Sequence, residues 1–216
     1  MVDMYITKEM WRLIIGGLQT TMLIFVFAAF FGVLLSIGLT CLCFNKKCQW
    51  LYEPLIWFVR TVRNVPAVAL MMFFYYVIFA GEWNGVVVTI IALSVYTSGM
   101  LADLFSLHIQ QVDRGQIEAG LSLGLTKSQC YRYIIIPQAA RSMFPLIAGE
   151  LQSLLQATSF VGYIGQDDLM KVVDGIREQY NDAFFPLVIS SVLYLALSWL
   201  ITVVFNYLSE KFFKHD

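Results

Sequence analysis

Five long apolar segments run along the chain, and polar stretches separate them. The first segment, residues 13–44, contains no Asp, Glu, Lys or Arg. The other four cover residues 51–80, 85–108, 137–164 and 183–208. A helix needs about 20 residues to cross the hydrocarbon core of a bilayer, and each segment exceeds that length. The pattern predicts an all-α integral membrane protein, with residues 1–216 forming one transmembrane domain.

The composition supports a membrane protein and argues against nucleic-acid binding. Hydrophobic residues make up 59% of the chain and charged residues only 13%, whereas soluble domains carry about 25% charged residues. The net charge of −1 leaves no concentration of Lys and Arg for a nucleic acid. The spacing of Cys41, Cys43 and Cys48 lacks the paired C-x2-C clusters of a zinc site, so we expect no metal.

The distribution of Lys and Arg predicts the orientation, because cytoplasmic loops retain positive charge. Five spans place the termini on opposite sides. With the N-terminus outside, ten of the 14 Lys and Arg residues face inward; these are Lys46, Lys47, Arg60, Arg63, Arg114, Lys127, Arg132, Arg141, Lys211 and Lys214. Only Lys8, Arg12, Lys171 and Arg177 then lie outside. The count predicts an external N-terminus and a cytoplasmic C-terminus and loop 109–136.

Loop 109–136 has the pattern of two short helices joined at a bend. Residues 116–123 fit a helix that Gly124 ends, because glycine adopts a positive φ without a Cβ penalty. Thr126 and Gln129 fit a capping box that starts the second helix. Pro137 suits the first turn of the next span, where its missing N–H costs little. A structured, partly apolar cytoplasmic projection favours a docking element for another protein, although a polar loop that is incidentally helical is the simpler alternative.

The same loop resembles the coupling loop of the permease subunits of ABC importers. Those subunits carry the pattern E-A-A-x3-G-x9-I-x-L-P. This chain has Glu118-Ala119-Gly120, Gly124 and Ile134-x-Ile136-Pro137 at the same spacing, with Gly120 in place of the second Ala and Ile136 in place of Leu. Gly120 is expected to loosen the helix slightly. Residues 17–21, 58–66 and 96–103 are similar to elements of the polar amino acid branch, the histidine, glutamine and glutamate type.

This resemblance implies a fold and a set of partners. The fold would be a five-transmembrane-helix, type I ABC importer permease core with a cytoplasmic coupling helix, in a bacterial inner membrane. The chain would not be an enzyme and would hold no cofactor, since ATP and magnesium would bind two copies of a separate ATPase. A second permease subunit, identical or sister, and an extracytoplasmic amino acid binding protein complete the expected assembly. Coupling to the ATPase would rest on Glu118, Ala119, Gly120, Gly124 and Pro137.

Several polar residues within the apolar segments are candidates for the translocation path or a gate. Glu150 either lines the path, where it would meet a substrate ammonium group, or pairs with Arg141 or another polar group. The second segment is interrupted by Arg63, Asn64 and Pro66. The interruption is either a gate or a plain kink in the helix. Asp103 would cap a helix or pair with an arginine.

The family commonly has L-L-K-D-T-S before the end of the fourth span. This chain has Leu154-Leu155-Gln156-Ala157-Thr158-Ser159, so the Lys-Asp pair is missing while Gln156, Thr158 and Ser159 remain candidates.

Other functions fit the sequence less well. A membrane enzyme would need clustered nucleophile and base residues, and the two histidines, His108 and His215, have no such neighbours. A permease for another small solute and a non-transport membrane scaffold are the remaining alternatives. Asp167, Asp168, Asp174, Glu178 and Asp182 make the loop 165–182 acidic, which suits either a solvated face or docking of a binding protein.

Overall fold

The computed structural model describes residues 8–44 and 49–213, and every regular element among these residues is a helix. The elements are α1 (Lys8–Phe44), α2 (Gln49–Arg63), α3 (Ala67–Met72), the π-helical η2 (Phe73–Ile78), α4 (Gly85–Gln111), α5 (Arg114–Ser122), α6 (Lys127–Cys130), the π-helical η3 (Tyr131–Ile135), α7 (Ile136–Ala157), the 3₁₀-helical η4 (Thr158–Ile164), α8 (Leu169–Tyr180) and α9 (Phe184–Phe213). Lys46, Lys47, Cys48, Lys214 and His215 lie outside the described residues.

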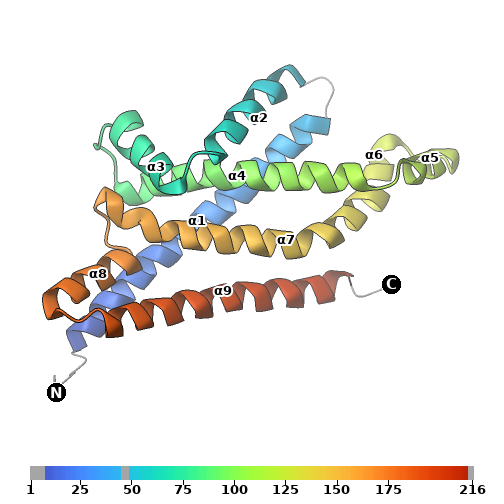
Figure 1. Ribbon diagram of the computed structural model, residues 1–216. Coiled ribbons are helices and arrows are strands. Elements are labelled where there is room, and N and C mark those ends of the chain that lie inside the picture. The colour runs from blue at the N-terminus through green and yellow to red at the C-terminus, as the bar shows by residue number, and fades with distance from the viewer. Residues whose placement is uncertain (1–7, 45–48, 214–216) are drawn as a thin grey trace.

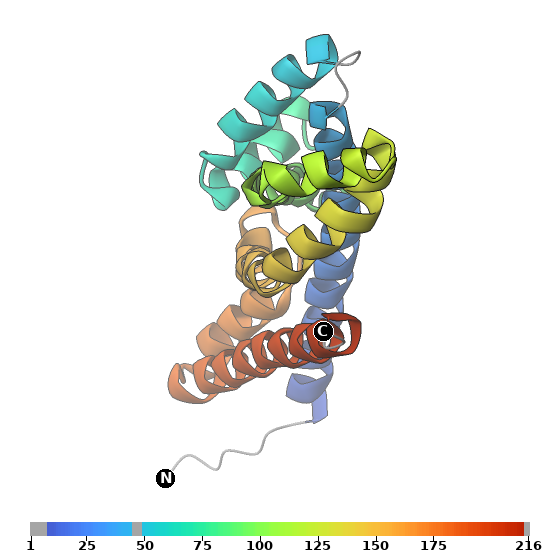
Figure 2. The ribbon, with the colours of Figure 1, turned by 90° about the vertical axis from the view of Figure 1, so that its right-hand side faces the viewer.

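The long helices α4, α7 and α9 lie roughly side by side, and α1 crosses behind them (Figure 1). Figure 2 looks at the molecule from the end that carries α5 and shows α1 running across α4 and α7. The start of α1 and the short helix α8 lie at one end of the molecule, whereas α5, α6 and the last turns of α9 lie toward the other (Figure 1). The start of α1 and the end of α9 therefore lie at opposite ends of the molecule.

Small residues allow α1 and α4 to pack closely. Ala28, Gly32 and Ser36 follow one another at four-residue spacing and are all buried. A Cβ at Gly32 would lie 3.1 Å from Cβ of Thr97 on α4. Small residues at this spacing are typical of helix pairs in membranes, where close van der Waals contact replaces the hydrophobic effect as the force of association. Around this contact, a core forms from Ile24, Met71, Leu93, Leu154 and Val161.

Helices occupy all five predicted apolar segments, but the second is not a straight span. Trp50–Arg63 and Ala67–Ile78 meet at an angle of 114°. The chain turns at Asn64 and Val65, and Pro66 precedes α3, so proline's missing N–H and its effect on the preceding residue interrupt the helix. By length and apolar character α1, α4 and α9 qualify as membrane spans among the described helices, and the bent pair would add a fourth. The helix α7 carries Arg141 and Glu150 and is less uniformly apolar.

The short helix α8 is anchored against α1 by a residue that the sequence placed on an acidic surface. Asp168 is fully buried, so it does not belong to the acidic face that the sequence predicted, whether solvated or docking. Its carboxylate accepts hydrogen bonds from the backbone N–H groups of Met170 and Lys171, at 3.2 and 3.0 Å. The Leu169 N–H donates to Oγ1 of Thr21 at 3.1 Å. A Cβ at Gly17 would lie 2.9 Å from the Asp168 carbonyl oxygen, so only glycine permits this approach.

Burial raises the pKa of the Asp168 carboxyl from 3.8 to about 6, although the N–H donors of Lys171 and Met170 oppose the shift. A pKa raised by folding means that the carboxyl contributes stability below pH 4 and that this contribution is lost as the pH rises through 6. We expect Asp168→Asn to keep the helix cap and to stabilise the protein at pH 8 by on the order of 2 kcal/mol. Melting temperatures at pH 5 and pH 8 test this.

The matched control is Asp174→Asn, because Asp174 is half-exposed and pairs with Arg177 at 2.7 Å. This control should retain the wild-type difference in melting temperature between the two pH values. If Asp168→Asn retains that difference too, the buried carboxyl is not its source.

Candidate functional site

The helix α5 begins and ends with well-formed caps. Asp113 precedes it, and the Asp113 carboxylate accepts a hydrogen bond from the Gly115 N–H at 3.0 Å. At the other end, Gly124 has a φ of +87°. The N–H groups of Gly124 and Leu125 donate to the carbonyls of Leu121 and Gly120, each at 3.0 Å. This is a Schellman ending, so the predicted glycine stop is confirmed.

The second short helix also follows the predicted pattern. Gln129 N–H donates to Oγ1 of Thr126 at 3.3 Å, and Thr126 N–H donates to Oε1 of Gln129 at 2.8 Å. This reciprocal pair confirms the capping box. From α6 the chain continues through η3 into α7, and Pro137 lies in the first turn of α7. The loop is therefore a rigid connection to a long helix of the bundle.

The two faces of α5 differ. Gly120 is buried toward α6 and η3, whereas Glu118 and Ala119 are exposed. Leu123, at the turn that follows α5, is 84% exposed. Tyr133 on η3 is also well exposed. The hairpin of α5 and α6 projects beyond the end of α4 (Figure 1). An exposed carboxylate beside exposed apolar side chains on a rigid projection gives the outward face the character of a protein-docking surface.

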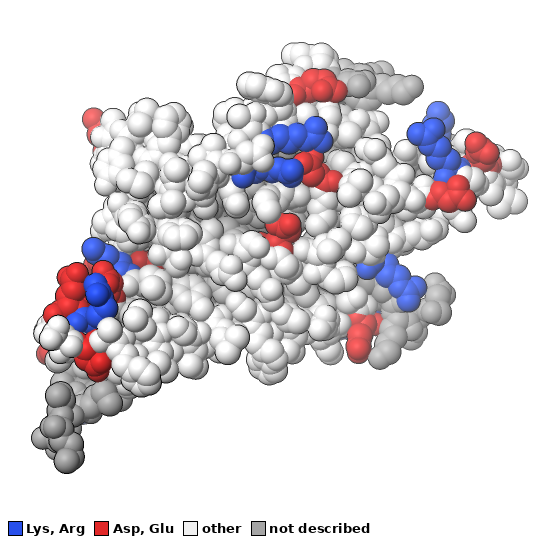
Figure 3. Space-filling model, in the orientation of Figure 1, with Lys and Arg blue, Asp and Glu red and all other residues white. Residues whose placement is uncertain are grey.

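A charged cluster connects α2 to α4. Arg60 and Arg63 contact the two oxygens of Asp103, at 2.7 and 2.6 Å. Gly99, one turn before Asp103, permits the contact, since a Cβ there would lie 2.7 Å from Cγ1 of Val59 on α2. Pairing rather than capping is therefore the role of Asp103. Figure 3 shows charges gathered at both ends of the molecule and in one central cluster, with most of the remaining face uncharged.

Glu150 lies near the same cluster. The side chain is partly exposed on α7, and the charge of Arg63 acts on it. No ion pair joins Glu150 to Arg141 among the described residues, so the pairing with Arg141 was wrong, and pairing with another polar group stays a prediction. Glu150 thus lies within range of the Arg63 charge without forming an ion pair with it, and Asn64 and Pro66 lie at the adjoining break between α2 and α3.

The other predicted path residues lie on a different side of α7. Thr158 is buried, and its hydroxyl donates to the Leu155 carbonyl at 2.6 Å. Gln156 and Ser159 border a cavity of about 440 Å³ shared with Ser191 and Ser198 of α9. Ala157, which stands where the family commonly has Asp, packs into the apolar core. The neutral replacement therefore matches its surroundings, and the predicted set does not form one site.

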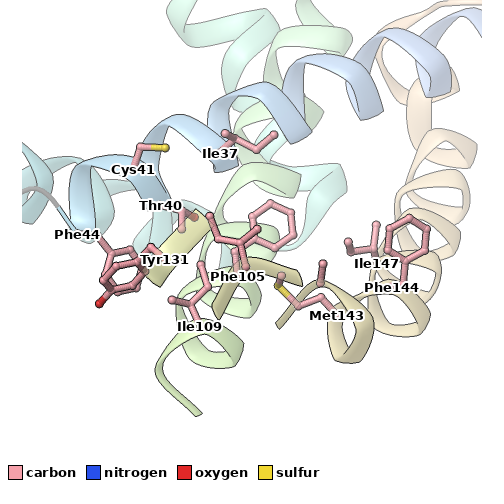
Figure 4. A pocket seen from close by; sticks show the side chains of 12 residues that line it. Ile37, Thr40, Cys41, Phe44, Phe105, Ile109, Tyr131, Met143, Phe144 and Ile147 are labelled. Atoms are coloured by element: carbon pink, nitrogen blue, oxygen red, sulfur yellow. The ribbon is translucent and has the colours of Figure 1, made fainter. Parts of the chain in front are cut away.

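An apolar groove of about 610 Å³ lies between the last turns of α1, the end of α4 and the start of α7 (Figure 4). Ile37 and Phe44 of α1 face Phe105 of α4 and Met143 of α7. Such a lining offers no charged partner to a zwitterionic or ionic solute. We therefore place the candidate path at Arg63 and Glu150 and not in this groove.

Sequence reasoning missed two features of the structure, the contacts of Gln152 and the burial of Asp168. Gln152 on α7 donates from Nε2 to the Ser198 carbonyl at 3.0 Å and to Oγ1 of Thr202 at 2.6 Å. An amide within an apolar helix is a signal for such a contact. The burial of Asp168 had only a weak local signal, because Gln166 and Asp167 before it are polar and only the apolar residues from Leu169 onward indicate a buried helix.

The closely packed apolar helices, the rigid polar projection and the charged cluster between helices define an integral membrane protein of the transport class. Residues 30–214 match the model of the family described as binding-protein-dependent transport system inner membrane component. The chain belongs to this family, and it is therefore a membrane component of a transport system.

Relatives and solved structures agree with this assignment. The chain is 30% identical over 171 residues to the probable glutamine ABC transporter permease protein GlnM of Bacillus subtilis, covering 78% of each protein. It is 26% identical to the glutamate/aspartate import permease protein GltK of Escherichia coli, covering 92% of each. The structure matches a chain in the crystal structure of an amino acid ABC transporter with histidines, with a TM-score of 0.81, 25% identity and coverage of 93% and 94%. A chain of the inward-facing MetNI methionine ABC transporter, 20% identical, has the same fold with a TM-score of 0.78.

Proposed function

We propose that this chain is one membrane half of an ATP-driven amino acid importer, and that α5 docks into a separate ATPase. The observation that carries the docking role is the outward face of α5 and its turn, where Glu118 and the 84%-exposed Leu123 lie on a rigid projection. The names of the relatives, permeases for glutamine and for glutamate and aspartate, support the substrate class.

The assembly that we propose contains two copies of the ATPase, which bind ATP and magnesium, and a second permease subunit. An amino acid binding protein would deliver the substrate at the opposite end, where α8 lies. The excess of Lys and Arg in the segments at the α5 end supports a cytoplasmic location for α5. The start of α1 would then be outside and the end of α9 inside.

The path within this chain would pass Glu150. A carboxylate in a membrane helix is costly unless it serves a pathway or a partner, and Glu150 has no ion-pair partner within the described residues. Every amino acid carries an ammonium group that a carboxylate attracts. Because Arg63 is already paired with Asp103, Glu150 is the carboxylate left to meet the substrate.

We expect Glu150→Gln to raise the amino acid concentration needed for half-maximal ATP hydrolysis by roughly tenfold, since one charge-assisted contact contributes about 1.5–3 kcal/mol. The measurement is ATP hydrolysis by the purified complex with its binding protein in lipid vesicles, titrated with glutamine, glutamate, arginine and histidine. The matched control is Ser153→Ala, because Ser153 lies on the exposed side of α7. Gln152 is not a suitable control position, because its side chain joins α7 to α9. Unchanged stimulation by every amino acid in Glu150→Gln would leave Glu150 with a structural role only.

A further inference from the structure

The Cys130 side chain packs against the buried side of α5, beside Ile134. The Cys130 side chain is fully buried, and its Sγ lies 3.9 Å from the Ile117 carbonyl oxygen of α5, to which it donates a weak hydrogen bond. A Cβ built at Gly120 would lie 2.7 Å from this sulfur and 3.1 Å from Cδ1 of Ile134. The sulfur therefore occupies the space that a side chain at position 120 would need.

This contact reverses the effect expected from replacing Gly120 with alanine. Read from the sequence, Gly120 only loosens the helix, and replacing it with alanine should strengthen α5, because alanine is the better helix former. In the structure, the alanine methyl would overlap Cys130, and a cysteine that rotated away would lose its contact with the Ile117 carbonyl. Overlap in a closely packed contact is destabilising. The two accounts predict effects of opposite sign.

We infer that Gly120 and Cys130 are a matched pair of positioning residues, which seat α5 on the η3 segment that continues into α7. The inference rests on the proposed docking role of α5. Movement of α5 would reach α7 through this contact and through the chain between them, so a displaced α5 would weaken coupling even with Glu118 intact. Gly120 and Cys130 are both buried. Neither is therefore part of the exposed surface of α5 that would contact the ATPase, and neither is a candidate for contact with the substrate.

The seating is tested first by the reactivity of Cys130, in the assembled complex with Cys41, Cys43 and Cys48 replaced by alanine. A buried thiol reacts slowly, so we expect slow labelling by N-ethylmaleimide. Gly120→Ala should speed the labelling about tenfold, because α5 would be lifted from the sulfur. The matched control is Gly175→Ala on α8, since a Cβ at Gly175 would meet no atom within 4 Å; it should leave the rate unchanged.

The coupling is tested by amino-acid-stimulated ATP hydrolysis in a double-mutant cycle. We expect about a tenfold loss with Gly120→Ala and at most about a threefold loss with Cys130→Ala. The double variant should recover to within about threefold of the wild type, because the smaller side chain at 130 makes room for the new methyl. This recovery is a readout that general destabilisation of the loop would not give.

The labelling and hydrolysis experiments test the matched pair and the docking role of α5 separately. Unchanged labelling in Gly120→Ala, or additive losses in the double variant, would overturn the matched pair. Faster labelling with unchanged ATPase binding and hydrolysis would support the seating and contradict the docking role of α5.

Discussion

Replacing Glu118 with lysine is expected to abolish coupled amino acid uptake and to release the ATPase from the membrane subunit. The Glu118 side chain is exposed on the outward face of α5, so the substitution leaves the contacts of Gly120 and the caps of α5 in place. A docking site that receives a carboxylate offers donors or positive charge, and a lysine there would meet like charge. Such a juxtaposition costs several kcal/mol, which corresponds to a loss of affinity of more than about tenfold.

The measurement is the amount of ATPase that copurifies with the permease, together with uptake of a radiolabelled amino acid. Glu82→Lys is the matched control, because Glu82 is an exposed carboxylate just before α4, at the other end of that helix from α5. We expect normal copurification with this variant. Wild-type copurification and uptake in Glu118→Lys would remove Glu118 from the docking surface.

The second large effect is expected from Asp103→Asn. Asp103 forms ion pairs with both Arg60 and Arg63, and its side chain is 23% exposed. It lies eight residues before the end of α4 at Gln111, about 12 Å along the helix axis, and therefore within the span. The amide would leave two positive charges without a counterion. Removing one partner of a buried pair costs about 3–5 kcal/mol; because Arg60 is half-exposed, we expect about 2 kcal/mol of unfolding free energy here.

The loss should appear as a lower melting temperature of the purified complex and a lower amount of protein in the membrane. Asp174→Asn, which removes a solvent-exposed ion pair with Arg177, is the control and should cost at most about 1 kcal/mol. Removing the arginine charges as well, in Arg60→Gln with Arg63→Gln and Asp103→Asn, should restore part of the stability. Equal melting temperatures for Asp103→Asn and the wild type would contradict the view that this cluster joins α2 to α4.

Local signals in the sequence predicted the coupling loop well. Gly124, Thr126, Gln129 and Pro137 each act within three or four residues of their own position, through caps and turns. Physical rules for short segments are therefore sufficient, and the structure confirms both short helices and the bend between them.

Long-range contacts were the part that sequence reasoning missed. Asp168 reads as a surface residue from its neighbours, yet its position is set by Gly17 and Thr21, about 150 residues away in the chain. Gly120 reads as a weak helix residue until Cys130 is placed beside it. The interruption of the second apolar segment at Pro66 was predicted, but the angle of 114° between its two helices was not.

Sequence reasoning also could not show which neighbours the candidate path residues contact, and these residues fall into two separate groups in the structure. Glu150 and Gln156 lie six residues apart on α7, and at 3.6 residues per turn they point to different sides of the helix. Periodicity separates them but does not say which neighbour each side meets. The structure shows that Gln156 faces the α9 side, while Glu150 lies within range of the charge of Arg63 on α2.

The measurement that tests the docking role of α5 most directly is cross-linking from position 123. A benzophenone attached through Leu123→Cys, in a background without the native cysteines, would lie at the most exposed apolar position of the hairpin of α5 and α6. The same probe at Tyr180→Cys, on α8 at the opposite end, is the control. We predict that light links position 123 to the ATPase subunit and that position 180 gives no such product. An ATPase product from position 180, or its absence from position 123 in an active complex, would contradict the account.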